Sequence, residues 1–409
     1  MYIRILLLLL PFGAMAQSLP LTMDKAVEMA LQQNKGLQSA ATQVEYYRYL
    51  TKTAGEVAKT DVSLQYGQYN SYVKNDNHFA ISQALPFPTV FGARKQLSKA
   101  QEEKAVWFKA NTQNELVYQV KQVYMQLLHQ KEQKRLLLHQ DSLFTTFARS
   151  AELRYRTGES RMLEKVAAEG RLNEVKNQLK QQEADAAIFT ARLQALLMTN
   201  DIPELTESGI PEQNITITAD TGVIKNNPYL EYLRQDVSIA EKQKQLLNAS
   251  IMPDITLGYF NLSLIGTPVD AAGVKMATGS NRFQGFQVGV ALPLWLGPMK
   301  ARVRAEEKQR QAASLNYDNG RTLLKGEYQQ AIEQYIKQQH NLSYYKGTAL
   351  PNAELILTQS QLAYSKGEIS YAEHFINMEQ VLNIRQGYLQ TLLDAKLAAL
   401  YIDFLQGNH

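Results

Sequence analysis

The chain has 409 residues and carries 43 Lys and Arg against 39 Asp and Glu, a formal net charge of +4. Because a nucleic-acid-binding domain concentrates basic charge far more strongly, this near balance argues against nucleic acid as a partner. None of the residues is cysteine, so packing or assembly must hold the fold together in place of disulfide bonds.

The N-terminus has the pattern of a secretory signal peptide. Arg4 precedes an apolar run from Ile5 to Leu10, and Ala14-Met15-Ala16 forms an A-x-A cleavage site, so we expect residues 1–16 to be removed on export. The run is too short to span a membrane, and no later stretch approaches the roughly 20 apolar residues that a membrane helix needs. Any contact with a membrane must then be made by strands.

The rest of the chain contains an internal repeat. Several stretches of the first half recur about two hundred residues later, which is too long a period for a solenoid module. The matching pairs are Asn34 with Asn227, Asp61–Tyr66 with Asp254–Tyr259, Ala84–Pro86 with Ala291–Pro293, and Tyr155–Glu159 with Tyr364–Glu368. We predict a first repeat at 17–199, an irregular equatorial connection at 200–226 and a second repeat at 227–409. Each repeat is expected to hold a helix, a β-hairpin and a long helical hairpin.

Each repeat is predicted to start with helix and continue with two strands. A helix from Thr22 to Asn34, with Thr22 as its N-cap, and a second helix to about Ala58 precede the first strand. The helix of the second repeat is expected at Pro228–Ala249. The strands alternate between an apolar face and a small or polar face, which suits a sheet with lipid on one side and water on the other. The apolar positions are Val62, Leu64 and Tyr66 in the first repeat and Phe286, Val288, Val290 and Leu292 in the second.

The helices that follow are exceptionally long. From Arg94 to about Arg156 the sequence has neither proline nor glycine, and about 62 helical residues would extend roughly 90 Å, too far for a compact domain. Apolar residues at heptad spacing predict that these rods pack lengthwise as coiled coils. The heptad positions are Leu116, Val120, Val123, Leu127, Leu324, Tyr328, Ala331 and Tyr335. Gly158 and Gly367 are predicted to be the hairpin tips, because glycine supplies a positive φ without steric cost, with return helices at about 160–198 and 370–405.

Four strands per chain cannot close a barrel, and an open sheet in a bilayer would leave unpaired backbone groups at its edges. The chain must therefore assemble: two copies would supply 8 strands and three copies 12. Phe87 and Trp295 follow the second strand of each hairpin, at the level where aromatic residues mark a membrane interface. Arg94 follows Phe87 in the sequence, and we expect it to contact the headgroup phosphates of outer-membrane lipid.

The signal peptide, the duplicated strand-strand-helix-helix order, the rod lengths and the two Tyr-x-x-Gly-Glu tips resemble the TolC-like outer membrane efflux proteins, and among them the heavy-metal efflux branch. The resemblance covers essentially the whole mature chain. It implies an α+β membrane protein, a homotrimer whose 12-stranded outer-membrane β-barrel, with four strands per chain, is continued by a long coiled-coil α-helical barrel through the periplasm of a Gram-negative bacterium. The implied function is the exit duct of a tripartite efflux pump, passing metal cations or small toxic compounds to the outside.

The same resemblance implies roles for particular residues. The hairpin tips would contact a periplasmic adaptor protein, which links the duct to an inner-membrane pump of the RND type. The matching positions are Tyr155, Gly158, Glu159, Tyr364, Gly367 and Glu368. The family closes its bore with acidic residues six and nine positions after the second tip glycine, which are here Glu373 and Ile376, so the second position departs from the pattern. Glu164 is the corresponding position of the first repeat, and these three residues are the expected pore gate.

No catalytic, cofactor or metal site is predicted, and the chain is not expected to be an enzyme. It lacks an H-E-x-x-H motif, a phosphate-binding glycine loop and a G-x-S-x-G motif. We interpret His129, His139, His340 and His374 as surface residues. The alternative function is that of a periplasmic adaptor or coiled-coil scaffold, which would also have a signal peptide and long hairpins. Such a protein usually carries one hairpin between β-rich modules, so two matched hairpins disfavour it.

Overall fold

The computed structural model describes residues 18–68, 75–211, 224, 227–263, 271–273 and 282–407. The chain divides into two units. The hairpin unit comprises Met1–Gln38, Asn111–Asn227 and Leu323–His409, and the sheet unit comprises Ser39–Ala110 and Pro228–Thr322. The predicted signal peptide and the later part of the predicted equatorial connection lie outside the described residues. Within the described part of the chain, no helix is both long and apolar enough to cross a membrane.

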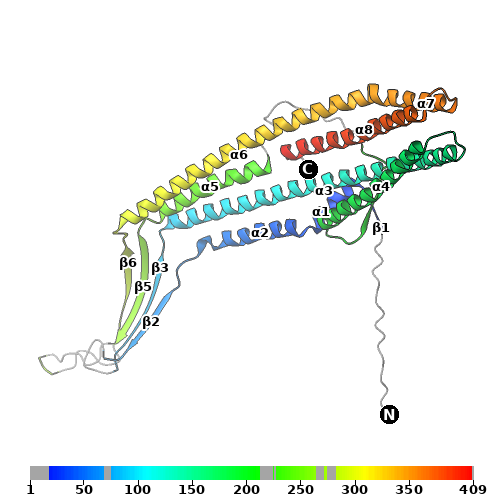
Figure 1. Cartoon of the computed structure of the whole chain (residues 1–409). Helices are drawn as coiled ribbons and strands as arrows, with labels where there is room; N and C mark the ends of the chain where they lie inside the picture. The colour runs from blue at the N-terminus through cyan, green and yellow to red at the C-terminus, as the bar shows by residue number, and fades with distance from the viewer. Residues whose placement is uncertain are drawn as a thin grey trace, which may run out of the picture. The chain divides into compact units, whose positions relative to one another are not determined.

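The sheet unit contains a four-stranded antiparallel sheet with the order β2-β3-β5-β6 (Figure 1). The strands are β2 (Asp61–Tyr66), β3 (Asn77–Leu85), β5 (Asp254–Ser263) and β6 (Arg282–Ala291). Most of α2 (Lys35–Lys52), all of α5 (Pro228–Ala249) and the first parts of α3 (Pro88–Arg156) and α6 (Leu296–Tyr344) belong to the same unit. The predicted strand at Asp61–Tyr66 and the predicted helix at Pro228–Ala249 are thereby confirmed.

Two helix boundaries differ from the prediction. The helix expected to reach about Ala58 ends at Lys52 and is followed by a single 3₁₀ turn, Thr53–Gly55. The Thr53 hydroxyl donates to the Leu50 carbonyl at 2.8 Å, and Gly55 has low helix propensity, so both residues favour an early end. The long helix α3 begins at Pro88 and not at Arg94, because proline at the first helical position has the required φ and needs no hydrogen-bond donor.

The two faces of the sheet have different chemistry. The register places Ile81 opposite Tyr259 and Tyr259 opposite Phe286, so apolar side chains align across the strands on one face. We call it the apolar face after its apolar side chains, and Asn77, Gln83, Asn261, Ser263, Arg282 and Gln284 also lie on it. The apolar side chains are Val62, Leu64, Tyr66, Phe79, Ile81, Leu85, Ile255, Leu257, Tyr259, Phe286, Val288 and Val290. This face is exposed within the chain, and Phe286 retains 87% of its accessible surface. The opposite face, the small-residue face, carries mainly Gly, Ala, Ser, Thr and Gln, so the predicted alternation is confirmed.

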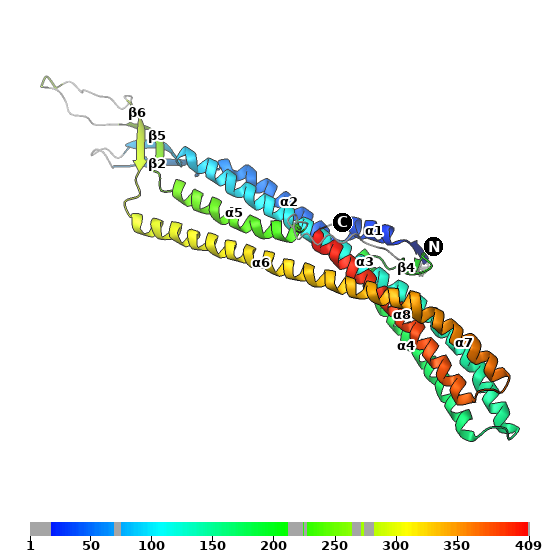
Figure 2. The same ribbon diagram turned by 90° about the horizontal axis from the view of Figure 1, so that it is seen from above.

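The hairpin unit consists of α1 (Met23–Gln33), α4 (Met162–Leu197), α7 (Leu350–Ser365), α8 (Tyr371–Gln406) and the remaining parts of α3 and α6. Thr22 caps α1 as predicted, since its hydroxyl accepts a hydrogen bond from the Lys25 N–H. The hairpin of α3 and α4 lies beside that of α7 and α8 (Figure 1, Figure 2). All the predicted heptad positions are buried, as lengthwise helix packing requires. The sequence did not reveal the parallel pairing of β1 (Ser18–Leu21) with β4 (Ile202–Leu205).

The outgoing helix of the second hairpin is interrupted where that of the first is continuous. Between α6 and α7 the residues Tyr345–Ala349 form one turn of π-helix, in which the Leu350 N–H bonds the Tyr345 carbonyl. Pro351 follows directly, and a proline ring clashes with the carbonyl four residues earlier in a regular α-helix. The wider π turn relieves that clash, so the helix can continue to the second tip.

Candidate functional site

The two hairpin tips share one backbone geometry. At the first tip the Glu159 N–H donates to the Arg154 carbonyl at 2.8 Å and the Gly158 N–H donates to the Tyr155 carbonyl at 3.1 Å. At the second tip the Glu368 N–H donates to Ala363 at 2.8 Å and the Gly367 N–H donates to Tyr364 at 3.0 Å. This pair of bonds defines a Schellman motif, and the glycine φ values of 78° and 76° supply the left-handed residue that the motif needs. The prediction of glycine caps is confirmed.

The tyrosines of the two tips lie in different surroundings. Tyr155 is 40% exposed, and the Lys165 ammonium lies 5.7 Å from its ring centroid. Tyr364 is half-buried, and its hydroxyl accepts a 3.1 Å hydrogen bond from the Arg154 guanidinium. Arg154 also lies 3.9 Å from the Glu159 carboxylate. One arginine of the first hairpin therefore connects the exposed acid of its own tip with the tyrosine of the second tip.

An aromatic cluster behind the tips joins the two hairpins. Phe147 of α3 stacks on Tyr371 of α8 with ring centroids 4.5 Å apart, and it also packs on Phe375. Tyr364 stacks on His374 at 4.7 Å with nearly parallel rings. Burial raises the pKa of the Tyr371 hydroxyl, because removal from water disfavours its charged form. The cluster thus consists of neutral rings from both hairpins.

Buried histidines correct the expectation that all of these side chains lie on the surface. His374 and His129 are both buried. His374 Nδ1 lies 2.8 Å from the Ser360 hydroxyl, which also accepts a hydrogen bond from the Asn377 amide at 3.2 Å, and burial lowers the pKa of His374. The burial of His374 could have been predicted from the sequence. Tyr371, His374, Met378 and Val381 follow the spacing of a buried helical stripe.

The three expected gate residues are distributed over two helix starts. Glu373 forms a capping box at the start of α8: its carboxylate accepts the Ser370 N–H at 2.8 Å, and the Ser370 hydroxyl accepts the Glu373 N–H at 3.2 Å. Hydrogen bonding from Ser370 to the carboxylate, first of all from its backbone N–H, lowers the pKa of Glu373. Ile376 is exposed, and Glu164 lies in the first turn of α4, whose N-cap has no side-chain hydrogen bond. Glu373 therefore has a structural role, whereas a gate at these residues stays a prediction.

The two aromatic residues expected at the membrane interface lie at the junctions between strand and helix. The half-buried Phe87 precedes α3, and its carbonyl accepts the Val90 N–H at 2.9 Å. Trp295 directly precedes α6 and is 84% exposed. The Arg94 guanidinium, expected to meet lipid phosphates, donates a 3.0 Å hydrogen bond to the Glu56 carbonyl. Part of its donor capacity is thus used within the chain.

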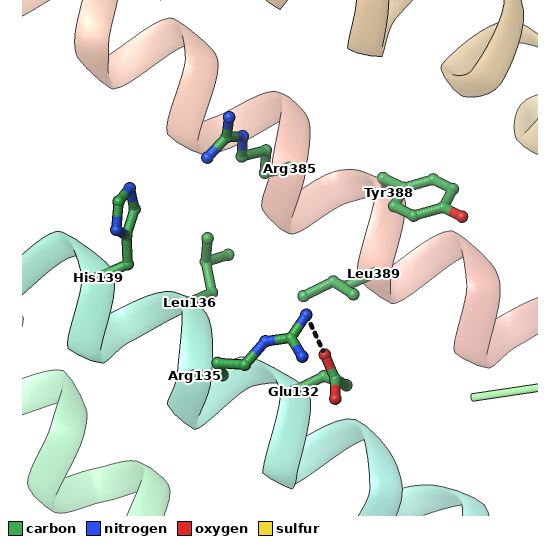
Figure 3. A pocket seen from close by; sticks show the side chains of 7 residues that line it. All are labelled: Glu132, Arg135, Leu136, His139, Arg385, Tyr388 and Leu389. Carbon is green, nitrogen blue, oxygen red and sulfur yellow. Dashed lines mark ion pairs between the residues drawn. The ribbon is translucent and has the colours of Figure 1, made fainter. Parts of the chain in front are cut away.

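A groove of about 420 Å³ lies between α3 and α8 (Figure 3). Its lining is Glu132, Arg135, Leu136, His139, Arg385, Tyr388 and Leu389. Arg135 pairs with Glu132 at 3.1 Å, and Arg385 pairs with Glu354 of α7 at 3.0 Å. The lining contains no Ser, Thr or Cys beside His139 that would resemble an activated nucleophile. Among the described residues there is also no group of three His, Asp or Glu side chains placed to hold a metal ion.

The structure is similar to solved structures of channels. It matches CusC, whose crystal structures concern folding and transmembrane channel formation, with a TM-score of 0.77 and 17% identity over 95% of this chain and 92% of that one. It matches the outer-membrane channel OprN with a TM-score of 0.76 and 16% identity over 95% and 90% of the two chains. The CmeC outer membrane channel of Campylobacter jejuni gives a TM-score of 0.75 and 14% identity over 94% and 85%.

No protein-family model and no curated protein matches the sequence. At these identities the structural similarity shows the fold, and the fold is that of outer-membrane channels.

Proposed function

We propose that this chain is one subunit of the exit duct of a tripartite efflux system, a TolC-like outer membrane factor. The observation that carries the proposal is the sheet: one face is apolar and exposed, the other is mainly small and polar, and the outer edges of β2 and β6 pair with no strand among the described residues. Such a sheet is stable in a bilayer only when its edges pair with further strands, because each unpaired backbone group costs on the order of several kcal/mol in lipid. The similarity to outer-membrane channels supports the same arrangement.

Assembly follows from the open edges. In a homotrimer β6 of one copy pairs with β2 of the next, and four strands per chain give a 12-stranded barrel with the apolar face toward lipid. Phe87 and Trp295 lie at the membrane interface, and the long hairpins form a coiled-coil α-helical barrel in the periplasm. In this proposal the protein resides in the outer membrane of a Gram-negative bacterium, is exported by the signal peptide at 1–16 and is built from two duplicated repeats.

The hairpin tips are the proposed contact with a periplasmic adaptor. Two loops with the same Schellman geometry each expose a glutamate, Glu159 and Glu368, and so offer the adaptor two related surfaces. The adaptor links the duct to an inner-membrane pump of the RND type. Glu164, Glu373 and Ile376 are the proposed gate. Glu373→Gln should then change the block of single-channel conductance by cations, whereas identical block would remove Glu373 from the gate.

Two neighbouring positions of β6 test the placement of the sheet. Val288 belongs to the exposed apolar face, and Gln287 belongs to the small-residue face. Lysine on the lipid face costs about 2–4 kcal/mol at the centre of a bilayer, so Val288→Lys should reduce the amount of assembled protein in outer-membrane fractions. Gln287→Lys, the matched control, should assemble and conduct. Equal assembly of both variants, or a mature protein that is soluble without detergent, would favour the alternative of a periplasmic scaffold.

The cargo is a metal cation, as in the heavy-metal branch, or a small toxic compound. Deleting the chain and measuring which compounds accumulate in the cells distinguishes these classes. Accumulation of neither class would contradict a role in efflux.

A further inference from the structure

The small-residue face of the sheet changes character near the loop end of its strands. Nearest the helices it carries Asp254 and Ala291, then Ala84, Thr256 and Gly289, followed by Asp61, Ser82, Gly258 and Gln287. Toward the loops the next row is Ser63, Ala80, Phe260 and Gly285, and the last row is Gln65, His78, Leu262 and Phe283. Two phenylalanines, next to Leu262, therefore lie on a face whose other side chains are small or polar. We call Phe260 and Phe283 the aromatic collar.

Phe260 lies flat against the neighbouring strand because Gly285 has no side chain. A Cβ added to Gly285 would lie 2.8 Å from Phe260 Cζ and 3.0 Å from Cε1, so the ring occupies the space that any other residue would fill. On the other side of Phe260 the paired residue is Ala80, which is also small. His78 packs against Phe260 in a T-shaped arrangement, with ring centroids 6.4 Å apart and planes at 71°. The ring thus lies over Gly285 on the small-residue face, where a larger residue would displace it.

The charges of this face have one sign. Among the described strand residues that point to it, the charged side chains are Asp61 and Asp254, and neither Lys nor Arg is present. An acidic, water-filled passage concentrates cations, and the face of an aromatic ring attracts a cation through its quadrupole. The acidic side chains and the aromatic rings therefore both favour a positively charged solute.

We propose that the aromatic collar is a contact site for organic cations leaving through the bore, and that Gly285 sets the width of the bore there by letting Phe260 lie flat. The inference rests on the proposed function, in which the small-residue face lines the bore. It narrows the cargo to positively charged organic compounds with apolar or aromatic groups. Three copies of the collar surround the passage close to its outer end.

Single-channel recording of the full-length protein in planar bilayers tests the collar, with two probes of the same shape and opposite charge. Tetraphenylphosphonium should block the wild-type current more strongly than tetraphenylborate. Phe260→Ala should weaken block by tetraphenylphosphonium by about two- to five-fold, the factor that one cation–π contact at an exposed site supplies. Equal block by both probes, or unchanged block in Phe260→Ala, would overturn the cation site.

Gly285→Ala should force the Phe260 ring off the strand and into the passage, which lowers conductance in simple salt. Gly289→Ala is the matched control, because its Cβ would lie 3.5 Å from Thr256 Cβ, an ordinary contact, and conductance should stay at the wild-type value. Adding Phe260→Ala to Gly285→Ala should restore conductance. If Gly285→Ala conducts as the wild type does, or if the double variant is not rescued, Gly285 does not set the width. Absence of any wild-type channel would instead contradict the proposed function.

Discussion

Replacing the two tip glycines tests whether the export machinery depends on the shape of the tips. Gly158 and Gly367 have left-handed backbones, and no atom beyond the adjacent residues lies within 4 Å of an ideal Cβ at either position. The main cost of a valine is therefore the strain of the left-handed conformation, about 1–2 kcal/mol per residue. That energy lowers the ratio of closed to open loop by about 5–30-fold at each tip.

Hydrogen exchange measures the opening directly. In the double variant Gly158→Val, Gly367→Val, the amides of Glu159 and Glu368 should exchange about 5–30-fold faster, because each donates a hydrogen bond that closes its loop. If the tips dock the adaptor as proposed, export by the assembled pump should fall, while the proposed trimers persist in detergent. Wild-type exchange at these two amides would refute the strain argument. Faster exchange with unchanged export would refute the role of the tips in docking.

Asparagine provides the matched control at both tips. Asparagine tolerates the left-handed region better than valine does, so Gly158→Asn, Gly367→Asn should keep nearly wild-type exchange and export. Gly170 lies within α4 with open space around it, and Gly170→Ala should leave the tips unchanged while favouring the helix by about 1 kcal/mol.

Other predictions concern the surroundings of the tips. Burial lowers the pKa of His374, so the stability that its neutral form contributes is present above the unfolded pKa of about 6.5 and is lost as the pH falls toward the folded value. Hydrogen exchange of α8, corrected for intrinsic rates, should therefore accelerate in acid, and His374→Phe should remove that effect. Phe147→Ala should reduce the free energy of unfolding by about 3–5 kcal/mol, because it deletes a buried ring that packs on Tyr371, and a loss below about 1 kcal/mol in thermal unfolding would contradict this. Hydrogen bonds from Ser370 lower the pKa of Glu373, so the capping box contributes above the unfolded pKa of about 4.3 and is lost as the pH falls through the folded value. Glu373→Gln should abolish this pH dependence in the exchange of the first turn of α8.

Local patterns in the sequence predicted much of the element order. The N-cap at Thr22, the helix that starts at Pro228 and the left-handed glycines at Gly158 and Gly367 depend on a few neighbouring residues, and each was confirmed. The strand β2 was also predicted with its observed bounds, because alternation is visible within six residues. The end of α2 was missed, since the helical pattern continues past Lys52 while the Thr53 hydroxyl and Gly55 terminate the helix.

The sequence predicted where the candidate site residues lie along the chain, but it did not predict which side chains they contact. Tyr155 and Tyr364 occupy the same place in two nearly identical motifs, yet only Tyr364 stacks on a histidine and accepts a hydrogen bond from Arg154. The difference comes from the helices packed against each tip, which the motif itself does not encode. Phe147 and Arg154 were missed for the same reason, because their partners lie on the other hairpin.

The sequence by itself predicted most of the helices and the strands of the four-stranded sheet, where the tips turn and which face of each of those strands is apolar, because capping, glycine backbone freedom and alternation act over short distances. Only the tertiary structure decided what those elements contact: the parallel pairing of β1 with β4, the burial of His374, and the ring of Phe260 lying on Gly285. These contacts join residues distant in the chain. Their energies depend on strand register and on helix packing, so no local pattern specifies them.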